Sequence, residues 1–473
     1  MRKNYGVRVA LWTTLLASFF ITACGDDSSS SPSNDDSSVS SSSNGENDSP
    51  IVWNDSSISK SWKGEGTESK PYQIGSADDL MELMKHVNDS ARAFRGYFFQ
   101  LTSDISLPSS WRPIGSFGAN PMGLSARPFS GNFDGNGKTI SGLSIKDTLS
   151  YSGLFGFVRA AQISNINLDA KTVEGGDRVG LLVGKADSSK IVKCSAKGSV
   201  KARDYVGGLI GEFAAGSVED LSMEGAVEGN GYVGGVIGNV TYSSVTNIRN
   251  SSVISGTVTI GGVVGSIAMS STLKNAINTG KVSSIKDVGG LVGNVIQANV
   301  NQCGNQGEVT GSSSYVGGAF ASVSNASVVS EIYNTAVVNG SGAMAAGGIV
   351  GMFKGSEMKD AFNIAAVIGE GNTYLGGIAG KVDGNTIDNT YNAGVVSQLK
   401  NANSRFGYTS FNTTTSNSFY DKDVASISLA EQGGMSSADM KSSSFLATLN
   451  GVSNVWSGSS DKFGGYPSFL WIK

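Results

Sequence analysis

The stretch Val206-Gly207-Gly208-Leu209-Ile210-Gly211 returns along the chain as VGGVIG, IGGVVG and VGGLVG. Related motifs extend the series in both directions at intervals of 27 to 30 residues. The motifs close at Gly156, Gly184, Gly211, Gly238, Gly265, Gly293, Ala321, Gly351 and Gly380. A fixed period of this length is typical of repeat proteins, in which each unit buries its apolar face against its neighbours.

A second series follows the glycine motifs and holds asparagine in six successive repeats. Its members are Asn250, Asn278, Asn305, Asn334, Asn363 and Asn392. Two residues further on, every repeat has a small residue, such as Gly280 or Gly307. If the repeats stack as coils about 4.8 Å apart, each asparagine can hydrogen-bond to those above and below it. The pattern therefore predicts an asparagine ladder at a turn.

The apolar residues of each repeat occur in short runs of Val, Ile and Leu, interrupted by Gly, Asn and Ser. Helical repeats need longer amphipathic runs with a 3.6-residue period, whereas these runs are typical of strands and turns. Parallel crossover connections are right-handed in the great majority of cases. We therefore expect an all-β fold, a right-handed parallel β-helix of about 27–30 residues per coil with short helical caps at both ends.

The beginning of the chain predicts its compartment. Basic residues precede an apolar stretch over 9–20, and Ile21-Thr22-Ala23-Cys24 resembles a bacterial lipobox. We expect residues 1–23 to be a lipoprotein signal peptide and Cys24 to carry the lipid. The alternative is a plain secreted protein with Cys24 as an incidental thiol, and the apolar stretch is too short for a membrane-spanning anchor. Residues 24–50, rich in Ser and Asp, are expected to form a disordered tether.

The charge balance narrows the range of partners. Without residues 1–23, 32 of the 35 basic residues remain against 39 acidic residues, a net charge of −7. This sign argues against nucleic acid and against an anionic membrane surface as binding partners. The expected contact with the membrane is the lipid on Cys24.

We divide the remainder into an N-terminal cap region over 51–115, a β-helix over 116–408 and a C-terminal capping region over 409–473. In the first region Ser76 and Asp79 have the spacing of a capping box before an apolar run, which predicts a helix. Strand-like pieces follow at 97–101, 111–114, 129–133 and 139–145, the last two joined by a turn over 134–137. Residues 435–449 predict a C-terminal helix.

Two further cysteines test the register. Cys194 and Cys303 each lie three residues after an apolar position of the repeat, so they share a column four coils apart. The expected separation of about 19 Å exceeds the limit of about 7 Å between Cα atoms for a disulfide. We predict two free, buried thiols that pack as small apolar groups.

The glycine motif resembles the GLUG motif, and the order of other segments is similar to that of proteins carrying it. Those segments begin at Gly66-Thr67 and include Trp111-Arg112-Pro113-Ile114-Gly115, Phe129–Gly137 and a Gly-Tyr-Pro tail. The resemblance covers almost everything from about Gly64 onward. It implies a bacterial envelope or extracellular protein of β-helical form, with adhesin-like relatives and others attached to immunoglobulin-cleaving peptidases. The repeat that ends at Ala321 departs from the motif, and we expect an irregular coil there.

The residues of the repeats do not form a recognisable catalytic constellation. His86, the one histidine, falls in the predicted cap helix, and an HExxH zinc site is excluded. Asp and Glu residues share no full column, and Asp220, Glu331 and Asp360 are interpreted as a polar turn edge. Asp134-Gly135-Asn136-Gly137 lacks the carboxylates of a calcium loop and is interpreted as a turn. We expect no cofactor and no metal.

A partial column of tyrosines stands directly before the glycine motifs and supplies candidate ligand-binding residues: Tyr205, Tyr232, Tyr315 and Tyr374. The following residue is always apolar, so alternation predicts that the tyrosines face solvent, with Tyr205 and Tyr232 on adjacent coils. Outward rings suit stacking on sugars. The alternative is an aromatic ladder that only stabilises the sheet.

These features lead to three hypotheses for function. The first is a monomeric, non-enzymatic, lipid-anchored envelope protein, in the outer membrane and exposed at the surface, that acts as an adhesin or binds a glycan or other surface. The second is a periplasmic or outer-membrane structural protein without an external ligand. The third is a polysaccharide-active enzyme, since lyases and hydrolases use β-helices with carboxylates on one face.

Overall fold

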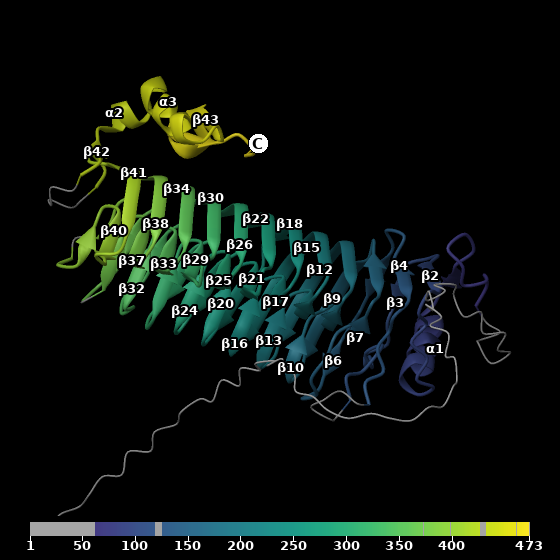
Figure 1. Cartoon of the computed structure of the whole chain (residues 1–473). Helices are drawn as coiled ribbons and strands as arrows, with labels where there is room; N and C mark the ends of the chain where they lie inside the picture. Colours follow the sequence, from purple (N-terminus) through teal and green to yellow (C-terminus); the bar gives the residue numbers. More distant parts are fainter. Residues whose placement is uncertain are drawn as a thin grey trace, which may run out of the picture. The chain divides into compact units, whose positions relative to one another are not determined.

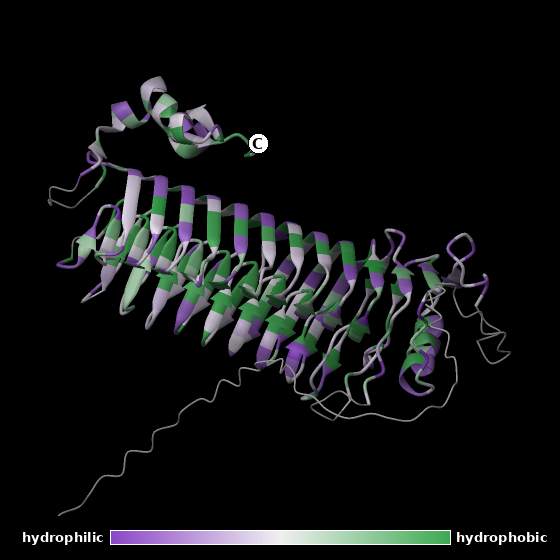
Figure 2. Ribbon diagram, in the orientation of Figure 1, coloured by the Kyte–Doolittle hydropathy of each residue, from purple (hydrophilic) through white to green (hydrophobic). Residues whose placement is uncertain are grey.

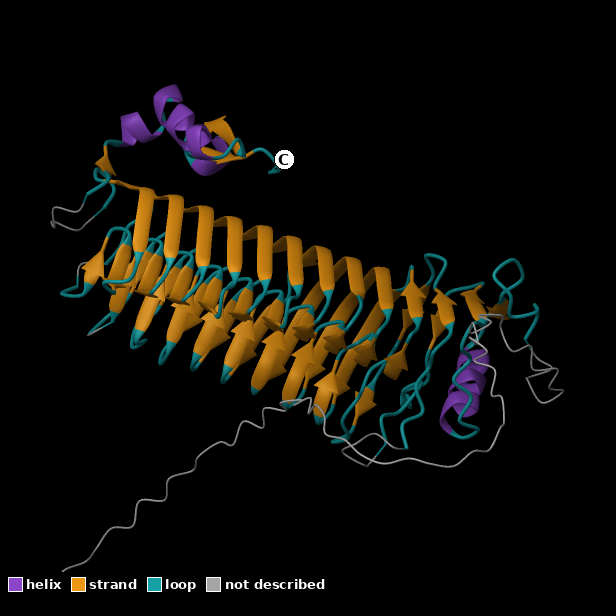
Figure 3. Ribbon diagram, viewed as in Figure 1, coloured by secondary structure: helices purple, strands orange, loops and turns teal. Residues whose placement is uncertain are grey.

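The computed structural model describes residues 62–118, 125–371, 373–397, 399–425, 432–459 and 461–472. The predicted signal peptide, Cys24 and the predicted tether lie outside the described residues. The described chain winds into coils stacked along one axis, with the strands of successive coils side by side (Figures 1 and 3). The expected all-β solenoid of parallel strands is confirmed.

Each coil of the repeat region passes through three parallel sheets, here named C, B and A in chain order. Sheet C has nine strands, seven of which end at the first glycine of the repeated motif. Its strands are β10 (Asp177–Val179), β13 (Asp204–Gly207), β16 (Gly231–Gly234), β20 (Thr259–Gly261), β24 (Asp287–Gly289), β28 (Tyr315–Gly317), β32 (Ala345–Gly347), β36 (Tyr374–Gly376) and β39 (Ala402–Asn403).

Sheet B follows one corner later and has ten strands. The second half of each glycine motif begins one of these strands, so the motif itself forms the corner between sheets C and B. The strands are β7 (Phe155–Arg159), β11 (Val183–Asp187), β14 (Ile210–Ala214), β17 (Ile237–Thr241), β21 (Val264–Ala268), β25 (Val292–Ile296), β29 (Phe320–Ser324), β33 (Val350–Lys354), β37 (Ala379–Asp383) and β40 (Phe406–Thr409).

Sheet A has 23 strands and holds one to three strands from each coil. Its strands are β1 (Tyr72–Ile74), β2 (Phe98–Leu101), β3 (Ile105–Ser106), β4 (Asn132–Asp134), β5 (Thr139–Ser141), β6 (Ile145–Lys146), β8 (Gln162–Ser164), β9 (Asn167–Glu174), β12 (Lys190–Lys201), β15 (Ser217–Gly229), β18 (Ser244–Asn250), β19 (Val253–Gly256), β22 (Thr272–Asn278), β23 (Val282–Ser284), β26 (Asn299–Asn305), β27 (Val309–Gly311), β30 (Val328–Asn334), β31 (Val338–Asn339), β34 (Glu357–Asn363), β35 (Val367–Ile368), β38 (Thr386–Asn392), β41 (Thr414–Asp421) and β42 (Gly434–Met435).

The core is a set of aliphatic columns that run along the inside of the solenoid. One column in sheet B contains Val183, Ile210 and Ile237, which pair coil to coil and are fully buried. Because side chains alternate between the two faces of a strand, every second residue enters this core. Hydrophobic residues consequently recur at the same place in successive strands (Figure 2). Each coil packs its apolar side chains against those of the coils above and below, as expected of a repeat protein.

The predicted asparagine ladder is confirmed. Side-chain amides link Asn250 to Asn278, and so on to Asn392, through five hydrogen bonds of 2.8 to 2.9 Å. Each amide also bonds to the backbone two residues ahead: Asn305 donates to Gly307 O and accepts from Gly307 N. The ladder therefore satisfies buried polar groups at the bend of sheet A.

The coils begin before the first glycine motif. β1 and β2 already pair in parallel, so the solenoid starts N-terminally of residue 116, the start expected from the repeats. These coils lack the glycine motif, and periodicity could not find them. Between them lies α1 (Ala77–Asn88), whose predicted capping box is formed by Ser76 and Asp79. Its buried face, with Leu80 and Leu83, joins the core at the N-terminal end.

Three local expectations were wrong. The coil containing Ala321 is regular, since β29 pairs with both neighbouring strands without a register shift. Residues 111–114 form no strand and contribute a single bridge, Ile114 to Phe155. Residues 435–449 contain two helices, α2 (Ser437–Met440) and α3 (Ser443–Val452), because Ser442 caps a new helix start through Phe445 N. The turn over 134–137 is confirmed, with Asp134 accepting from Asn136 N.

The C-terminal segment packs on the side of the solenoid. It consists of α2, α3, a short 3-10 helix (Asp461–Phe463) and a hairpin of β43 (Trp456–Ser459) and β44 (Pro467–Phe469). Its apolar side chains cover an outward aromatic column on three successive coils, Tyr333, Phe362 and Tyr391. In Figure 1 the segment lies beside the edge of the solenoid that carries β30 and β34. Buried Asp360 accepts a 3.0 Å hydrogen bond from Trp456 Nε1 and thereby fixes the segment.

The last coil exchanges aliphatic for hydroxyl residues. Thr409 pairs with Val382 of the previous coil, and Thr415 pairs with Ile387. Both threonines are exposed. A polar final coil reduces the tendency of the end strands to pair with other chains.

The two described cysteines are free and buried, as predicted. The register from Cys194 through Leu221, Ile248 and Ala276 places Cys303 in the same inward column four coils later. Burial raises the pKa of both thiols to about 12.

Candidate functional site: an aromatic ladder beside a charged triad

The structure divides the predicted tyrosine column into two halves with different backbones. Tyr205 and Tyr232 have φ values of 57° and 51°, in the left-handed region, and Tyr151 and Arg178 on the two preceding coils have 65° and 61°. Bulky residues rarely adopt this conformation, which costs on the order of 1–3 kcal/mol each. Four successive coils therefore share one strained position at the start of the glycine motif.

The side chains of these four residues and Phe117 form a continuous stack, which we call the aromatic ladder. The Phe117 and Tyr151 rings are 4.8 Å apart and nearly parallel. The guanidinium of Arg178 lies 5.4 Å from the Tyr151 ring and 4.7 Å from the Tyr205 ring. Tyr205 and Tyr232 stack at 5.1 Å with a 12° interplanar angle. Stacking and cation–π contacts offset part of the backbone strain.

The ladder ends at Tyr232. The next coil has Thr259 at this position, which is buried and smaller. Tyr205 has Arg178 on one face and Tyr232 on the other, whereas among the described residues Tyr232 has an aromatic neighbour on one side only. Tyr232 is 38% exposed. Tyr232 is therefore the member of the ladder that best presents a ring face to a ligand.

Tyr315 and Tyr374 lie in the same column but in regular strand backbone, where Ala345 pairs with both. Both are half-buried at the surface. Tyr374 approaches Tyr408 at 5.5 Å in a tilted arrangement, and Lys381 lies 5.6 Å from the Tyr408 ring. The prediction of an outward tyrosine column is confirmed, but the four candidates do not form one surface.

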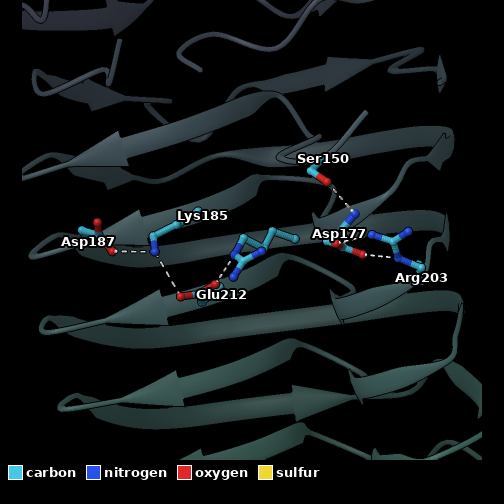
Figure 4. Close-up of polar contacts among 7 residues, drawn as sticks. Ser150, Asp177, Lys185, Asp187, Arg203 and Glu212 are labelled. Atoms are coloured by element: carbon cyan, nitrogen blue, oxygen red, sulfur yellow. Dashed lines mark hydrogen bonds and ion pairs between the residues drawn. The ribbon is translucent and has the colours of Figure 1, made fainter. Parts of the chain in front are cut away.

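A charged triad lies beside the ladder at the corner between sheets C and B. Glu212 accepts hydrogen bonds from Arg178 and, at 3.1 Å, from Lys185 (Figure 4). Lys185 also lies 3.6 Å from Asp187 and 5.1 Å from the Phe117 ring. Glu212 and Lys185 are mostly buried, so the triad fixes the Arg178 guanidinium between the two rings. Burial lowers the pKa of Arg178, but Glu212 and the neighbouring tyrosines outweigh it and the pKa is raised.

A second ion pair, between Arg203 and Asp177, lies at the start of strand β10 in sheet C. Arg203 donates to Asp177 at 2.7 Å, and Asp177 N donates to Ser150 Oγ at 3.0 Å (Figure 4). The Arg203 side chain is exposed, so this pair contributes little to stability.

Burial raises the pKa of Tyr205, and the nearby Arg178 opposes this rise. The Tyr205 hydroxyl therefore stays protonated at neutral pH and can both donate and accept a hydrogen bond.

These contacts belong to a complementary pair of coils that our sequence analysis missed. Residues 177–203 hold seven basic and two acidic side chains, whereas residues 204–230 hold six acidic and no basic ones. Ion pairs join the two coils at Arg178–Glu212, Lys185–Glu212, Lys197–Glu224, Lys201–Glu228 and Arg203–Asp204. Counting charge per repeat, instead of searching each column for carboxylates, would have found the pair. The pairs to Glu212 are mostly buried and favour this register, whereas the pairs of Lys197, Lys201 and Arg203 are exposed and contribute little.

The carboxylates considered as catalytic candidates occupy structural positions. Asp220, Glu331 and Asp360 have φ values of 54° to 57° and belong to a polar turn column, as predicted. Asn247 donates to Asp220 at 2.9 Å, one coil away. The His86 ring packs edge-on against Trp62 in the N-terminal aromatic cluster. Within the described ranges, no group of three or more His, Cys, Asp or Glu residues could hold a metal ion.

Comparisons with known proteins give partial similarities. No family model matches the chain. A stretch of 137 residues is 33% identical to Halomucin of Haloquadratum walsbyi, covering 27% of this chain and 1% of that protein. Another of 126 residues is 38% identical to a "Putative Gly-rich membrane protein" of Evansella cellulosilytica, covering 26% of this chain and 14% of that protein. The chain thus spans a small part of these relatives.

Among solved structures, a "putative immunoglobulin A1 protease" from Bacteroides ovatus aligns over 87% of this chain and 95% of its own, with 14% identity and a TM-score of 0.29. No described helix is long and apolar enough to cross a bilayer.

Proposed function

We propose that this protein is a non-enzymatic, lipid-anchored cell-surface solenoid that binds an external glycan or glycan-coated surface through the aromatic ladder. The observation that carries the proposal is the exposed ring of Tyr232 at the end of a rigid, strained stack. A ring held by its neighbours loses little conformational entropy when a ligand stacks on it. Asn239 follows Glu212 in the adjacent column of sheet B, is partly exposed and supplies a hydrogen-bonding partner.

The lipid anchor and the GLUG relationship remain part of the proposal. The names of the two relatives, a halomucin and a Gly-rich membrane protein, are consistent with a place in the cell envelope. A lipid on Cys24 would attach the solenoid through the predicted tether. Replacing Cys24 with Ser is expected to abolish incorporation of labelled fatty acid and to release the protein from membranes.

The periplasmic structural role is the second candidate, favoured by the asparagine ladder, whose amides hydrogen-bond to one another inside the stack. Adding protease to intact cells, with a periplasmic protein as control, distinguishes the surface-binding role from the periplasmic structural role. Degradation of the solenoid while the control survives supports surface exposure. Protection until the envelope is broken would favour the structural role. Release of reducing sugars from polysaccharides by the purified chain would instead favour the enzyme hypothesis.

A further inference from the structure

The outer face of sheet A carries a polar hollow in the first coils, away from the aromatic ladder. Its volume is about 280 Å³, and it spans the strands β2, β4 and β8. The side chains that define it are Phe98, Gln100, Asn132, Asp134, Gln162 and Asn165. Two carboxylates, Asp134 and the exposed Glu68, four carboxamides and one phenyl ring thus meet on a concave surface.

Asp134 organises the hollow. Its Oδ2 accepts a 3.0 Å hydrogen bond from Gln100 Nε2, and its Oδ1 accepts from Asn165 Nδ2 at 2.8 Å and from Asn136 N at 2.9 Å. Burial opposes ionisation, but these hydrogen bonds outweigh it and hold the pKa of Asp134 below its ordinary value. The carboxylate is therefore charged at neutral pH and orients both amides.

The amides keep capacity for a ligand. Each carboxamide has two N–H donors and one carbonyl acceptor, and the bond to Asp134 uses one donor of Gln100 and one of Asn165. Gln162 is exposed, and Phe98 and Asn132 are half-exposed. The amides of the buried asparagine ladder have no such capacity, because they hydrogen-bond to one another and to backbone groups. The hollow thus offers oriented donors and acceptors beside an apolar ring.

A cation does not fit this arrangement. Both oxygens of Asp134 already face N–H donors, which a metal ion would have to displace. The two carboxylates of the hollow, Asp134 and Glu68, are fewer than a calcium site uses, and among the residues that the structure describes no group of three or more His, Cys, Asp or Glu residues could hold a metal ion. Groups that both donate and accept are instead suited to hydroxyls, and a phenyl ring is suited to the apolar face of a sugar.

We propose that this hollow binds one residue of a neutral sugar chain, with the amides of Gln100, Gln162 and Asn165 bonding its hydroxyls and Phe98 stacking against it. The site is separate from the aromatic ladder, and its own variants test it.

The full chain, purified in detergent, is titrated with maltohexaose, cellohexaose and mannohexaose. Saturation-transfer NMR and calorimetry measure the binding. Gln162→Ala removes an exposed amide without disturbing the core, and Asp134→Asn keeps the shape of the side chain while removing its charge. Asn299→Ala is the matched control, because Asn299 is exposed in the same column five coils further along.

We expect at least one hexasaccharide to bind, with an affinity reduced about 10-fold or more by Gln162→Ala and by Asp134→Asn, and unchanged by Asn299→Ala. Binding of none of the three sugars, or equal affinity in all variants, would overturn the proposal. Binding that requires added Ca²⁺ would also overturn it. Binding lost in Tyr232→Ala but kept in Gln162→Ala would place the sugar on the aromatic ladder and reject the hollow.

Discussion

The side-chain amide of Asn278 donates a 2.9 Å hydrogen bond to Oδ1 of Asn305 on the next coil. The same amide groups contact the second glycine of the repeated motif. A Cβ on Gly262 would lie 2.6 Å from Asn278 Cγ, and one on Gly290 would lie 2.3 Å from Asn305 Cγ. The second glycine of each motif is therefore required because the asparagine side chain occupies the space that a Cβ would need.

Replacing Asn305 with Ala is expected to destabilise the protein by about 2–4 kcal/mol, because its neighbours in the ladder and Gly307 lose partners while buried. The midpoint of guanidinium unfolding measures the effect. Asn299→Ala, which alters an exposed side chain on the same strand, is the control and should leave the midpoint unchanged. Equal midpoints for the two variants would mean that the ladder does not stabilise the stack.

Gly290→Ala is expected to prevent normal stacking, because the new Cβ would lie 2.1 Å from Gly318 O in the backbone of the next coil. Backbone cannot move aside as a flexible side chain can. Circular dichroism and the yield of folded protein measure the loss. Gly451→Ala, in α3 and with no atom within 4 Å of the added Cβ, should instead keep or raise stability by up to about 1 kcal/mol.

Much of the fold could be predicted from the sequence because its constraints repeat. The glycine corner, the asparagine ladder and the shared column of Cys194 and Cys303 all follow from one period. The capping box of Ser76 and Asp79 is a local signal, so the start of α1 could also be predicted from the sequence. For the candidate site, alternation along the strand was enough to predict the outward tyrosines and the neighbouring positions of Tyr205 and Tyr232.

Other features depend on contacts that a single column does not reveal. Tyr151 and Arg178 share the left-handed backbone of Tyr205 and Tyr232 and belong to the same stack. A search for tyrosines alone misses Arg178, because it is not aromatic. The docking of the C-terminal segment depends on Asp360 meeting Trp456, 96 residues away in sequence. The hollow at Asp134 arises where two coils without the glycine motif meet the first coil that has it, so the period does not fix the register of its first two strands.

The thiols of Cys194 and Cys303 are expected to resist labelling in the native protein at about pH 8 and to react after unfolding. Burial raises both pKa values from 9.0 to about 12. Because the folded pKa values exceed the unfolded ones, this contribution to stability is complete below about pH 9 and is lost as the pH rises through about 12. Labelling with Ellman's reagent before and after unfolding checks this. Rapid native labelling would contradict the buried register.

Asp360→Ala is expected to loosen the C-terminal segment without unfolding the solenoid, because Trp456 Nε1 loses its buried acceptor. Hydrogen exchange of α3 should accelerate by about 10- to 100-fold, while exchange in β22 stays slow. Asp388→Ala is the control, since the hydrogen bonds of Asp388 go to Ser416 and Asn417 on the next coil. Equal exchange of α3 in both variants would show that Asp360 does not hold the segment.

The central claim, that the aromatic ladder binds a glycan, is tested most directly by glycan-array binding of the wild-type chain, Tyr232→Ala and Tyr315→Ala. Tyr232→Ala removes the terminal ring, with an expected stability loss of about 0.5–1.5 kcal/mol for the Tyr205 stack. Tyr315→Ala removes a tyrosine of the same column outside the ladder. We predict that only Tyr232→Ala abolishes binding. Binding that survives in Tyr232→Ala, with the loss of stability alone, would show that the ladder is structural and contradict the account.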